Sequence, residues 1–149
     1  MIKNIGEKPK DASVIIPHYN KKILLQLRSN NKKIFYPLKW GCIGGAKEKG
    51  ERSVTTALRE FFEETNINID SKDLIFFSKL EFFVKPQNKV IKRFFYTLKI
   101  KNLSNFMKNL KVNEGRKLKF FNEITFNKLS KVVPYDKFML DYFFHKNKH

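Results

Sequence analysis

Three glutamates, Glu60, Glu63 and Glu64, are spaced so that they would share one face of a helix, because residues three and four positions apart lie close together on its surface. Carboxylate oxygens are hard ligands that suit Mg²⁺ or Mn²⁺, ions that keep several waters and also bind the phosphate oxygens of a substrate. The spacing therefore indicates a divalent-metal site. The alternative interpretation is a solvated acidic face, with Arg59 relieving part of the repulsion between like charges.

Acidic residues are concentrated around this cluster, although the chain as a whole is basic. Five of the 14 Asp and Glu residues lie between Glu48 and Glu64. Three of the 6 glycines, Gly41, Gly44 and Gly45, stand just before the predicted helix and indicate tight backbone geometry. We therefore expect the chemistry of the chain to reside in residues 41–66.

The segment from Gly45 onward matches a known pattern. It has five residues and then Glu51, seven residues and then Arg59, followed by the rest of the run REFFEETNI up to Ile67. This resembles the Nudix box, G-x5-E-x7-R-E-U-x-E-E-x-G-U, in which U is a bulky aliphatic or aromatic residue. Every charged position matches, and Asn66 replaces the usual Gly, a mild departure because both residues tolerate positive φ. The likeness covers roughly residues 11–145.

The resemblance implies a role for each matched residue. Four positions would supply metal ligands: the backbone carbonyl of Gly44 and the carboxylates of Glu60, Glu63 and Glu64. Glu63 is also implied to orient the attacking water. Arg59 would hold Glu51 or another carboxylate in place, and Gly45 and Glu51 would maintain the structure of the motif. The implied cofactor is Mg²⁺, with Mn²⁺ as the alternative.

The general base of such enzymes often lies outside the box. Glu114, in a turn with Gly115, is the candidate here. Its alternative role is a charge that keeps a loop solvated. Glu123 is the reserve choice, although Asn122-Glu123 before Ile124 is more typical of a helix start.

Substrate-contacting residues are predicted less directly. Arg28 ends the second predicted strand, where similar proteins place an arginine that contacts phosphate, and the alternative is an exposed arginine without a partner. Phe35, Tyr36 and Trp40 have the aromatic surface needed to stack on a base. Such residues more often belong to a lid or to the core.

The elements that must position these residues follow from periodicity and turn signals. The apolar stripe Val54, Ala57, Leu58, Phe61 and Phe62 predicts a helix over residues 53–66, with Ser53 as N-cap and Asn66 as terminator. The other predicted elements are hairpins over 12–27 and 74–100, a short strand at 118–121 and a helix at 138–144 after Pro134. This is an α+β order. The resemblance specifies a Nudix-type α/β/α sandwich with a mixed β-sheet and a loop–helix–loop catalytic motif.

Composition limits the remaining possibilities. With 149 residues we expect one domain over 1–149, in which residues 1–10 form a polar, flexible lead-in. Cys42 is the single cysteine, which excludes an intramolecular disulfide and argues against a Cys-ligated zinc site. No apolar stretch is long enough to span a bilayer, and no signal-peptide core is present, so we expect a cytoplasmic protein without membrane contact, either monomer or homodimer.

The net charge of +17 is compatible with nucleic-acid binding, but 26 of the 31 basic residues are Lys and only 5 are Arg. Phosphate-reading grooves more often use Arg, so nucleic acid is the less favoured partner. The resemblance implies a metal-dependent hydrolase that cleaves the pyrophosphate linkage of a small nucleotide, such as a (d)NTP or a nucleotide-sugar. The alternatives are an RNA 5′-end pyrophosphohydrolase and a non-catalytic nucleotide-binding module. The retained box carboxylates argue against the non-catalytic module.

Overall fold

The computed structural model describes residues 10–30, 36–112 and 116–148. Its strands are β1 (Ala12–Tyr19), β2 (Lys22–Leu27), β3 (Trp40–Gly41), β4 (Ile43–Ala46), β5 (Leu74–Val84), β6 (Lys89–Lys99) and β7 (Lys117–Phe121). Its helices are α1 (Ser53–Thr65), α2 (Leu103–Asn109), α3 (Glu123–Asn127) and α4 (Pro134–Lys146). The 3₁₀ turns η1 (Ser71–Asp73) and η2 (Lys85–Gln87) flank β5.

The strands form one mixed sheet with β1 at its centre. β1 runs parallel to β6 and antiparallel to both β2 and β4. β5 pairs with β6 at one edge, and β7 pairs with β2. This topology brings the loop after β4, the end of β2 and the start of β7 towards helix α1, where the candidate site lies.

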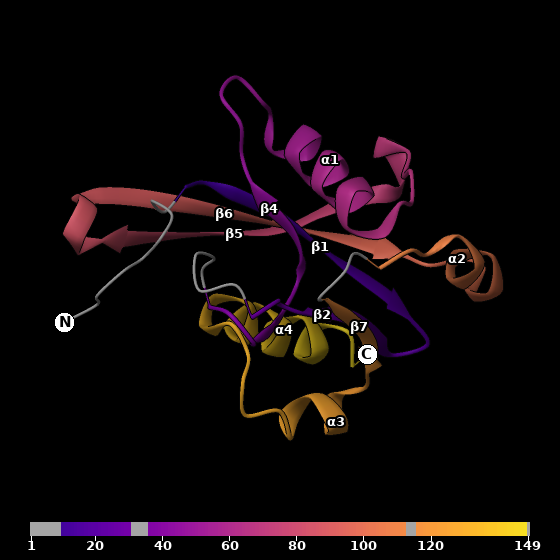
Figure 1. Cartoon of the computed structure of the whole chain (residues 1–149). Helices are drawn as coiled ribbons and strands as arrows, with labels where there is room; N and C mark the ends of the chain where they lie inside the picture. The colour runs from indigo at the N-terminus through magenta and orange to yellow at the C-terminus, as the bar shows by residue number, and fades with distance from the viewer. Residues whose placement is uncertain (1–9, 31–35, 113–115, 149) are drawn as a thin grey trace.

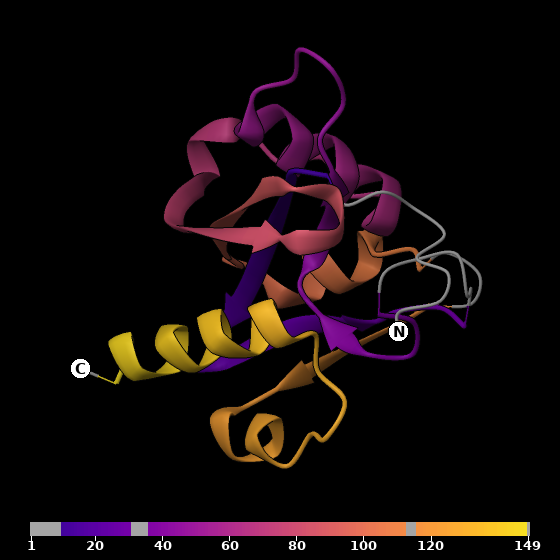
Figure 2. The same ribbon diagram turned by 90° about the vertical axis from the view of Figure 1, so that its left-hand side faces the viewer.

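Helices α1 and α4 cover opposite faces of this sheet (Figures 1 and 2). Alternating residues of β1 serve the two faces, as the two-residue period of a strand requires. Ile15 belongs to the apolar cluster under α1 with Phe61, whereas Val14 and Ile16 belong to the cluster under α4 with Leu140. The predicted α/β/α sandwich is therefore confirmed.

Helix α1 agrees with its prediction except at two residues. It ends at Asn66, whose φ of 62° is the left-handed conformation expected of a terminator. The N-cap, however, is Arg52 rather than Ser53, because the Ser53 hydroxyl is 2.6 Å from the Tyr96 hydroxyl and is engaged there. Phe62 is 42% exposed and does not belong to the buried stripe that Ala57 forms with its apolar neighbours.

The other predicted elements are confirmed, with some changes in their bounds. The C-terminal helix begins at Pro134, a residue favoured in the first turn, rather than at 138. The Asn122 side chain accepts the Thr125 N–H and caps α3. Helix α2 was not predicted, although its cap, Asn102, is a residue type typical of that position. Within the described part of the chain, no helix is long and apolar enough to cross a membrane.

Candidate active site

Arg59 joins the loop after β4 to the acidic face of α1. Its Nε donates to Glu51 Oε2 and its Nη2 to Glu51 Oε1, both at 2.9 Å. Nη2 also donates to the Ala46 carbonyl at 3.0 Å. Nη1 donates to Glu60 at 2.9 Å and to Glu63 at 3.3 Å. One guanidinium thus fixes the loop against two carboxylates of the helix.

Glu51 closes the same loop from the other side. It accepts the Glu48 N–H at 2.8 Å and the Thr56 hydroxyl at 3.1 Å. These bonds, with those from Arg59 first in importance, lower the pKa of Glu51 to about 2. Glu51 is therefore ionised at any physiological pH and acts as a permanent brace between loop and helix.

Glycines at positions 44 and 45 allow the loop to pass close to its neighbours. A Cβ at Gly44 would overlap the carbonyl oxygen of Ser13 on β1. A Cβ at Gly45 would overlap the Glu60 carboxyl group. Close approach, rather than an unusual φ, is what requires glycine here, and it places the backbone of this turn against a carboxylate of α1.

The three carboxylates of α1, which the spacing predicts on one helix face, pair with two different guanidiniums. Glu60 and Glu63 turn towards Arg59, whereas Glu64 turns towards Arg116. Among the described residues, no three acidic, histidine or cysteine side chains converge as a metal site would require. The physical reason is that two guanidiniums attract the carboxylates in different directions.

Glu64 is the most buried of the three, with a side chain only 10% exposed, against 53% for Glu63. Glu64 Oε2 lies 2.7 Å from Arg116 Nη1, and the contact is an ion pair rather than a hydrogen bond. Oε2 has no hydrogen-bond partner within the described residues. Burial raises the pKa of Glu64, and Arg116 offsets part of that rise.

Arg116 is held in position by the buried side-chain amide of Gln26. Its Nη1 donates to Gln26 Oε1 at 3.1 Å, and Gln26 Nε2 donates to the Cys42 carbonyl at 3.2 Å. Gln26 is 1% exposed and lies in β2 opposite Leu118 of β7. The strand pairing therefore sets the position of the amide, and the amide sets the position of the guanidinium.

Two further arginines lie in the same electrostatic neighbourhood. Arg93 donates from Nε and Nη2 to the two oxygens of Asp136, at 2.8 and 3.0 Å, and Asp136 also accepts the Cys42 N–H at 2.9 Å. Arg28 has a buried Nε that lacks a hydrogen-bond partner among the described residues. Burial, and then the charges of Arg93 and Arg116, lower the pKa of Arg28. This incompletely compensated guanidinium fits an anionic ligand.

The predicted aromatic residues separate into two environments. Tyr36 contacts Tyr135, with the hydroxyls 3.3 Å apart, and Tyr135 stacks on Phe82 at a centroid distance of 4.2 Å. Trp40 instead packs edge-on against Phe121 at 4.9 Å, within the hydrophobic cluster under α4. Trp40 is thus partly buried against the core, as the alternative interpretation expects, and its stacking on a base stays a prediction.

The two candidates for the general base are Glu114 and Glu123. Glu114 lies outside the described residues, as does Phe35. Glu123 begins α3 and pairs with Lys148 at 3.1 Å. Among its described ion pairs and hydrogen bonds, none joins it to the carboxylates of α1.

Sequence reasoning missed several residues of the site, namely Gln26, Arg93, Arg116 and Asp136. The sequence feature that could have identified the arginines among them is the scarcity of arginine in the chain. Only 5 of the 31 basic residues are Arg, and Arg28, Arg59, Arg93 and Arg116 all belong to this region. Arginine is not interchangeable with lysine where a planar fork must meet a carboxylate or a phosphate, so its retention in a lysine-rich chain marks such positions.

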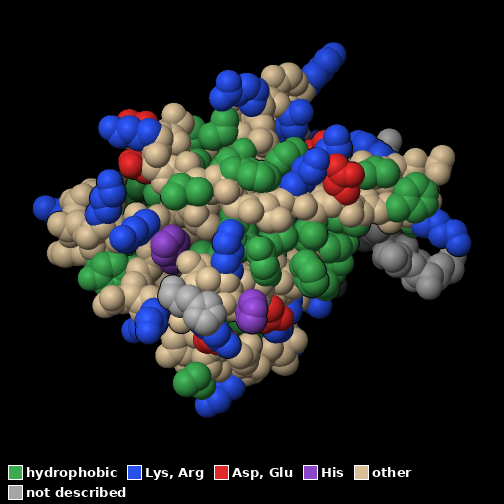
Figure 3. Space-filling view, turned by 180° about the vertical axis from the view of Figure 1, so that it is seen from behind, with side chains coloured by type: hydrophobic (Ala, Val, Ile, Leu, Met, Phe, Trp, Pro, Cys, Tyr) green, Lys and Arg blue, Asp and Glu red, His purple; other side chains and the backbone are tan. Residues whose placement is uncertain are grey.

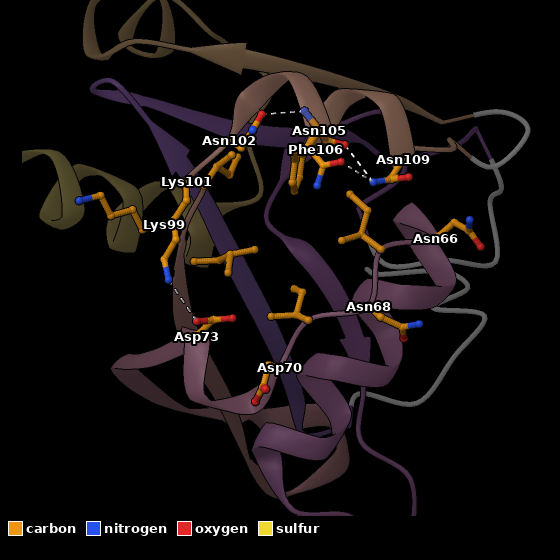
Figure 4. Close-up of a pocket in the computed structure, with 14 residues that line it drawn as sticks. Asn66, Asn68, Asp70, Asp73, Lys99, Lys101, Asn102, Asn105, Phe106 and Asn109 are labelled. Atoms are coloured by element: carbon orange, nitrogen blue, oxygen red, sulfur yellow. Dashed lines mark hydrogen bonds and ion pairs between the residues drawn. The ribbon is translucent and has the colours of Figure 1, made fainter.

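A separate cavity of about 400 Å³ lies beyond the C-terminal end of α1, between η1, β6 and α2 (Figure 4). None of the predicted site residues lines it. Its amides largely bond within α2, as Asn102 does with the Asn105 N–H, and Lys101 pairs with Asp73 at 3.7 Å. Its polar side chains therefore serve local structure, and the cavity is distinct from the carboxylate site.

The carboxylate site meets the chemical requirements of a divalent cation. Burial raises the pKa of both Glu60 and Glu64, which shows that their negative charges are incompletely compensated. Glu64 Oε2 is a buried oxygen without a hydrogen bond in the described chain. All the candidate donors are oxygens, the ligand type that Mg²⁺ and Mn²⁺ prefer.

We compared the chain with protein-family models, curated proteins and solved structures. The family model of the NUDIX domain matches residues 8–142. No curated protein matches the chain in sequence.

Several solved structures resemble the chain. A MutT protein from Methanosarcina mazei is 18% identical, with 96% of this chain and 99% of that one covered and a TM-score of 0.71. A Caenorhabditis elegans Ap4A hydrolase is 18% identical, with coverage of 89% and 95% and a TM-score of 0.59. A bifunctional NMN adenylyltransferase/ADP ribose pyrophosphatase from Francisella tularensis, complexed with AMP and a Mn ion, is 14% identical, with coverage of 93% and 42% and a TM-score of 0.64. At these identities the similarity establishes the fold alone.

Proposed function

The chain belongs to the NUDIX family, a family of hydrolases that act on pyrophosphate bonds, and from this premise we propose its reaction. It hydrolyses the pyrophosphate linkage of a small nucleotide, such as a (d)NTP or a nucleotide-sugar, with Mg²⁺ or Mn²⁺ as cofactor. The observation that carries the proposal is the Arg59 network. This single side chain holds Glu51, Glu60 and Glu63 together with the loop that contains the motif glycines.

The buried carboxylates of α1 would bind the cation. Glu60 and Glu64 are the principal ligands, with the Gly44 carbonyl as a further one, and Glu63 binds an additional ion or orients water. Bound there, the divalent ion would polarise a phosphate oxygen and make the attacking water more acidic. Arg59 and Glu51 contribute by keeping Glu60 and the glycine loop in place, which lowers the entropic cost of assembling the site.

Arg28 is positioned to bind the substrate's phosphate. Its buried Nε has no hydrogen-bond partner among the described residues, and burial, followed by nearby positive charges, lowers the pKa of Arg28, so a bound anion would favour the charged guanidinium. Tyr36 remains our candidate for contact with the base. Its partner Tyr135, together with Phe82, forms an aromatic group near the start of α4. Aromatic surfaces of this kind stack on bases without strong sequence preference.

For the general base we propose Glu114, which lies outside the described residues. A base accepts a proton from the attacking water, so its loss should lower kcat more than it raises KM. Glu114→Gln should reduce kcat by at least about 100-fold, the lower end of the effect typical of a general base, with thermal stability unchanged. Steady-state kinetics measure this. A Glu114→Gln enzyme with near wild-type kcat would exclude Glu114, and a large loss of kcat in Glu123→Gln, measured in parallel, would then assign the base to Glu123.

The net charge of +17 favours one second candidate, hydrolysis at the 5′ end of RNA. However, Figure 3 shows Lys and Arg side chains scattered over the face that it displays, interspersed with apolar groups, rather than gathered into one stripe. The arginines, which read phosphate best, lie in the compact site instead. The small-nucleotide substrate is therefore the better supported of the two.

A substrate panel tests the proposed function. The protein is incubated with nucleoside triphosphates, nucleotide-sugars, dinucleoside polyphosphates and 5′-triphosphorylated RNA, with Mg²⁺, with Mn²⁺ or with a chelator. We expect metal-dependent cleavage of at least one small nucleotide, with products identified by chromatography. Cleavage of the RNA alone would favour the second candidate, and cleavage unaffected by the chelator would contradict the metal assignment.

A further inference from the structure

Arg116 has not been assigned a role by the motif, yet it is the only described arginine paired with Glu64. We propose that Arg116 is a counter-ion shared between the metal-binding carboxylate and the substrate: it competes with the divalent ion for Glu64 and binds the substrate's phosphate. The inference rests on the proposed function, because it assumes that Glu64 binds the ion and that the substrate carries a pyrophosphate group.

The competition follows from the geometry at Glu64. Arg116 Nη1 lies 2.7 Å from Glu64 Oε2, and the Glu64 side chain is only 10% exposed. A divalent ion bound by Glu64 would therefore lie close to a positive guanidinium. Like charges repel more strongly where solvent screening is reduced. Arg116 thus lowers the affinity of Glu64 for a cation as long as no anion is present.

Arg116 is also prevented from moving far from Glu64. Gln26 has one conformation in which its amide satisfies both neighbours, with Nε2 towards the Cys42 carbonyl and Oε1 towards Arg116. Because Gln26 is buried in β2, this orientation is set by the core. Gln26 is therefore a positioning residue, and it keeps the guanidinium at the edge of the carboxylate site.

The remaining donors of Arg116 are suited to phosphate. The described contacts use Nη1 alone, and Nε and Nη2 have no hydrogen-bond partner within the described residues. The side chain is 25% exposed, so these donors are accessible to a ligand. A guanidinium binds phosphate oxygens through two parallel N–H groups. The charge of Arg116 also contributes, after burial and Arg93, to lowering the pKa of Arg28, so an anion bound by Arg116 would offset part of this repulsion.

Two substitutions distinguish the effect of the positive charge of Arg116 from the effect of its bidentate guanidinium group, called the fork here. Arg116→Gln removes the charge, whereas Arg116→Lys keeps the charge and removes the fork. Binding of Mn²⁺ alone is measured by calorimetry or electron paramagnetic resonance, without substrate. We expect Arg116→Gln to bind Mn²⁺ about 3–10-fold more tightly than wild type, and Arg116→Lys to bind it about as wild type does. Lys117→Gln, which removes one exposed charge next to Arg116, is the matched control and should change the affinity less than about twofold.

Binding of methylenediphosphonate, a diphosphate with a carbon bridge, is then measured at saturating Mn²⁺. Both Arg116 variants should bind it at least about tenfold more weakly, because both lack the bidentate fork. Unchanged or weaker Mn²⁺ binding by Arg116→Gln would overturn the competition. Diphosphonate binding at wild-type strength by both variants would overturn the phosphate role. Circular dichroism of each variant establishes that the fold is retained.

These outcomes are distinguishable from failure of the proposed function. Glu64→Gln should bind Mn²⁺ much more weakly than wild type. If it binds Mn²⁺ normally, the metal assignment itself is wrong, whatever the Arg116 variants do. If it loses Mn²⁺ binding while Arg116→Gln has unchanged affinity, the metal site stands and the proposed competition is wrong.

Discussion

Two arginines hold the acidic face of α1, and they do so in opposite ways. Arg59 uses all three of its nitrogens in hydrogen bonds, to Glu51, Glu60, Glu63 and the Ala46 carbonyl. Arg116 uses one nitrogen, for Glu64 and Gln26. The Arg59 guanidinium is saturated and belongs to the scaffold, whereas within the described residues Arg116 retains unused donors and Glu64 an oxygen without a hydrogen bond.

This difference distinguishes residues that stabilise the structure of the site from residues that bind ligands. A saturated network holds its members in one geometry and has little capacity for another ligand. A buried charge that is incompletely compensated favours a ligand of opposite sign. We therefore expect substitutions of Arg59 and Glu51 to act mainly through structure, and substitutions of Glu64 and Arg116 to act mainly through ligand binding.

The largest effect is expected at Glu64. Glu64→Gln should lower turnover of the identified substrate by at least about 100-fold, because removing one group that stabilises transition-state charge typically costs that much. The fold should be retained, since the substitution preserves size. Steady-state kinetics with Mg²⁺ measure the loss, and Glu81→Gln, in an exposed pair with Lys79, is the control. Turnover by Glu64→Gln close to the wild-type rate would remove the distinction between the two centres.

The next largest effect is expected on stability, at the buried pair of Arg93 and Asp136. Asp136 is 0% exposed, so Asp136→Asn leaves a buried guanidinium without its counter-charge. Loss of one partner of a buried pair costs about 3–5 kcal/mol, measured here by urea unfolding. Asp141→Asn, in the exposed pair with Lys137, should cost less than about 1 kcal/mol. Equal costs at the two positions would show that burial does not govern these pairs.

A smaller, pH-dependent effect is expected at the scaffold centre. The pKa of Glu51 is lowered from 4.5 to about 2, chiefly by Arg59, so the stabilisation is complete above the unfolded-state pKa and is lost as pH falls through the folded-state value. Arg59→Gln should therefore lower Tm most above about pH 5, and the difference from wild type should vanish near pH 2. Thermal unfolding across this range measures it, with Arg52→Gln as the exposed control. A Tm difference that does not change with pH would contradict the assigned pairing.

The smallest effect is expected from salt concentration on substrate binding. Its size distinguishes binding of a small nucleotide by the arginines of the site from binding of RNA by the many surface lysines. A small nucleotide held by metal and a few side chains should show a KM that changes less than about threefold between roughly 0.05 and 0.2 M salt. Binding of RNA by many lysines would fall by orders of magnitude over the same interval. Tight binding of RNA that depends on its 5′-triphosphate and survives about 0.2 M salt would favour the RNA substrate instead.

The sequence predicted the elements of the fold well, because their signals are local. The apolar period of α1, the Asn66 terminator and the two hairpins all depend on neighbouring residues. Helix α2 was missed because its only buried residue is Phe106, so it has little apolar periodicity to detect.

The site was predicted in part, and the reason for the omission is physical. The residues of the Nudix box are close in sequence, so their spacing was enough to predict that they belong to the site. Arg116, which pairs with Glu64, contacts Gln26 because β7 pairs with β2, and these two residues are 90 positions apart. Helical spacing places the three carboxylates on one face of α1 but does not specify their ion-pair partners. Their ion pairs are made with Arg59, four residues before Glu63, and with Arg116, which directly precedes β7.

The most direct test of the central claim is hydrolysis in ¹⁸O-labelled water, with wild type and Glu64→Gln compared on the same substrate. The account predicts metal-dependent cleavage by the wild type, with one ¹⁸O atom incorporated into a phosphate group of a product, and loss of that labelled product with Glu64→Gln. Label in a group other than phosphate, or equal amounts of labelled product from both proteins, would contradict water attack on phosphorus at the carboxylates of α1.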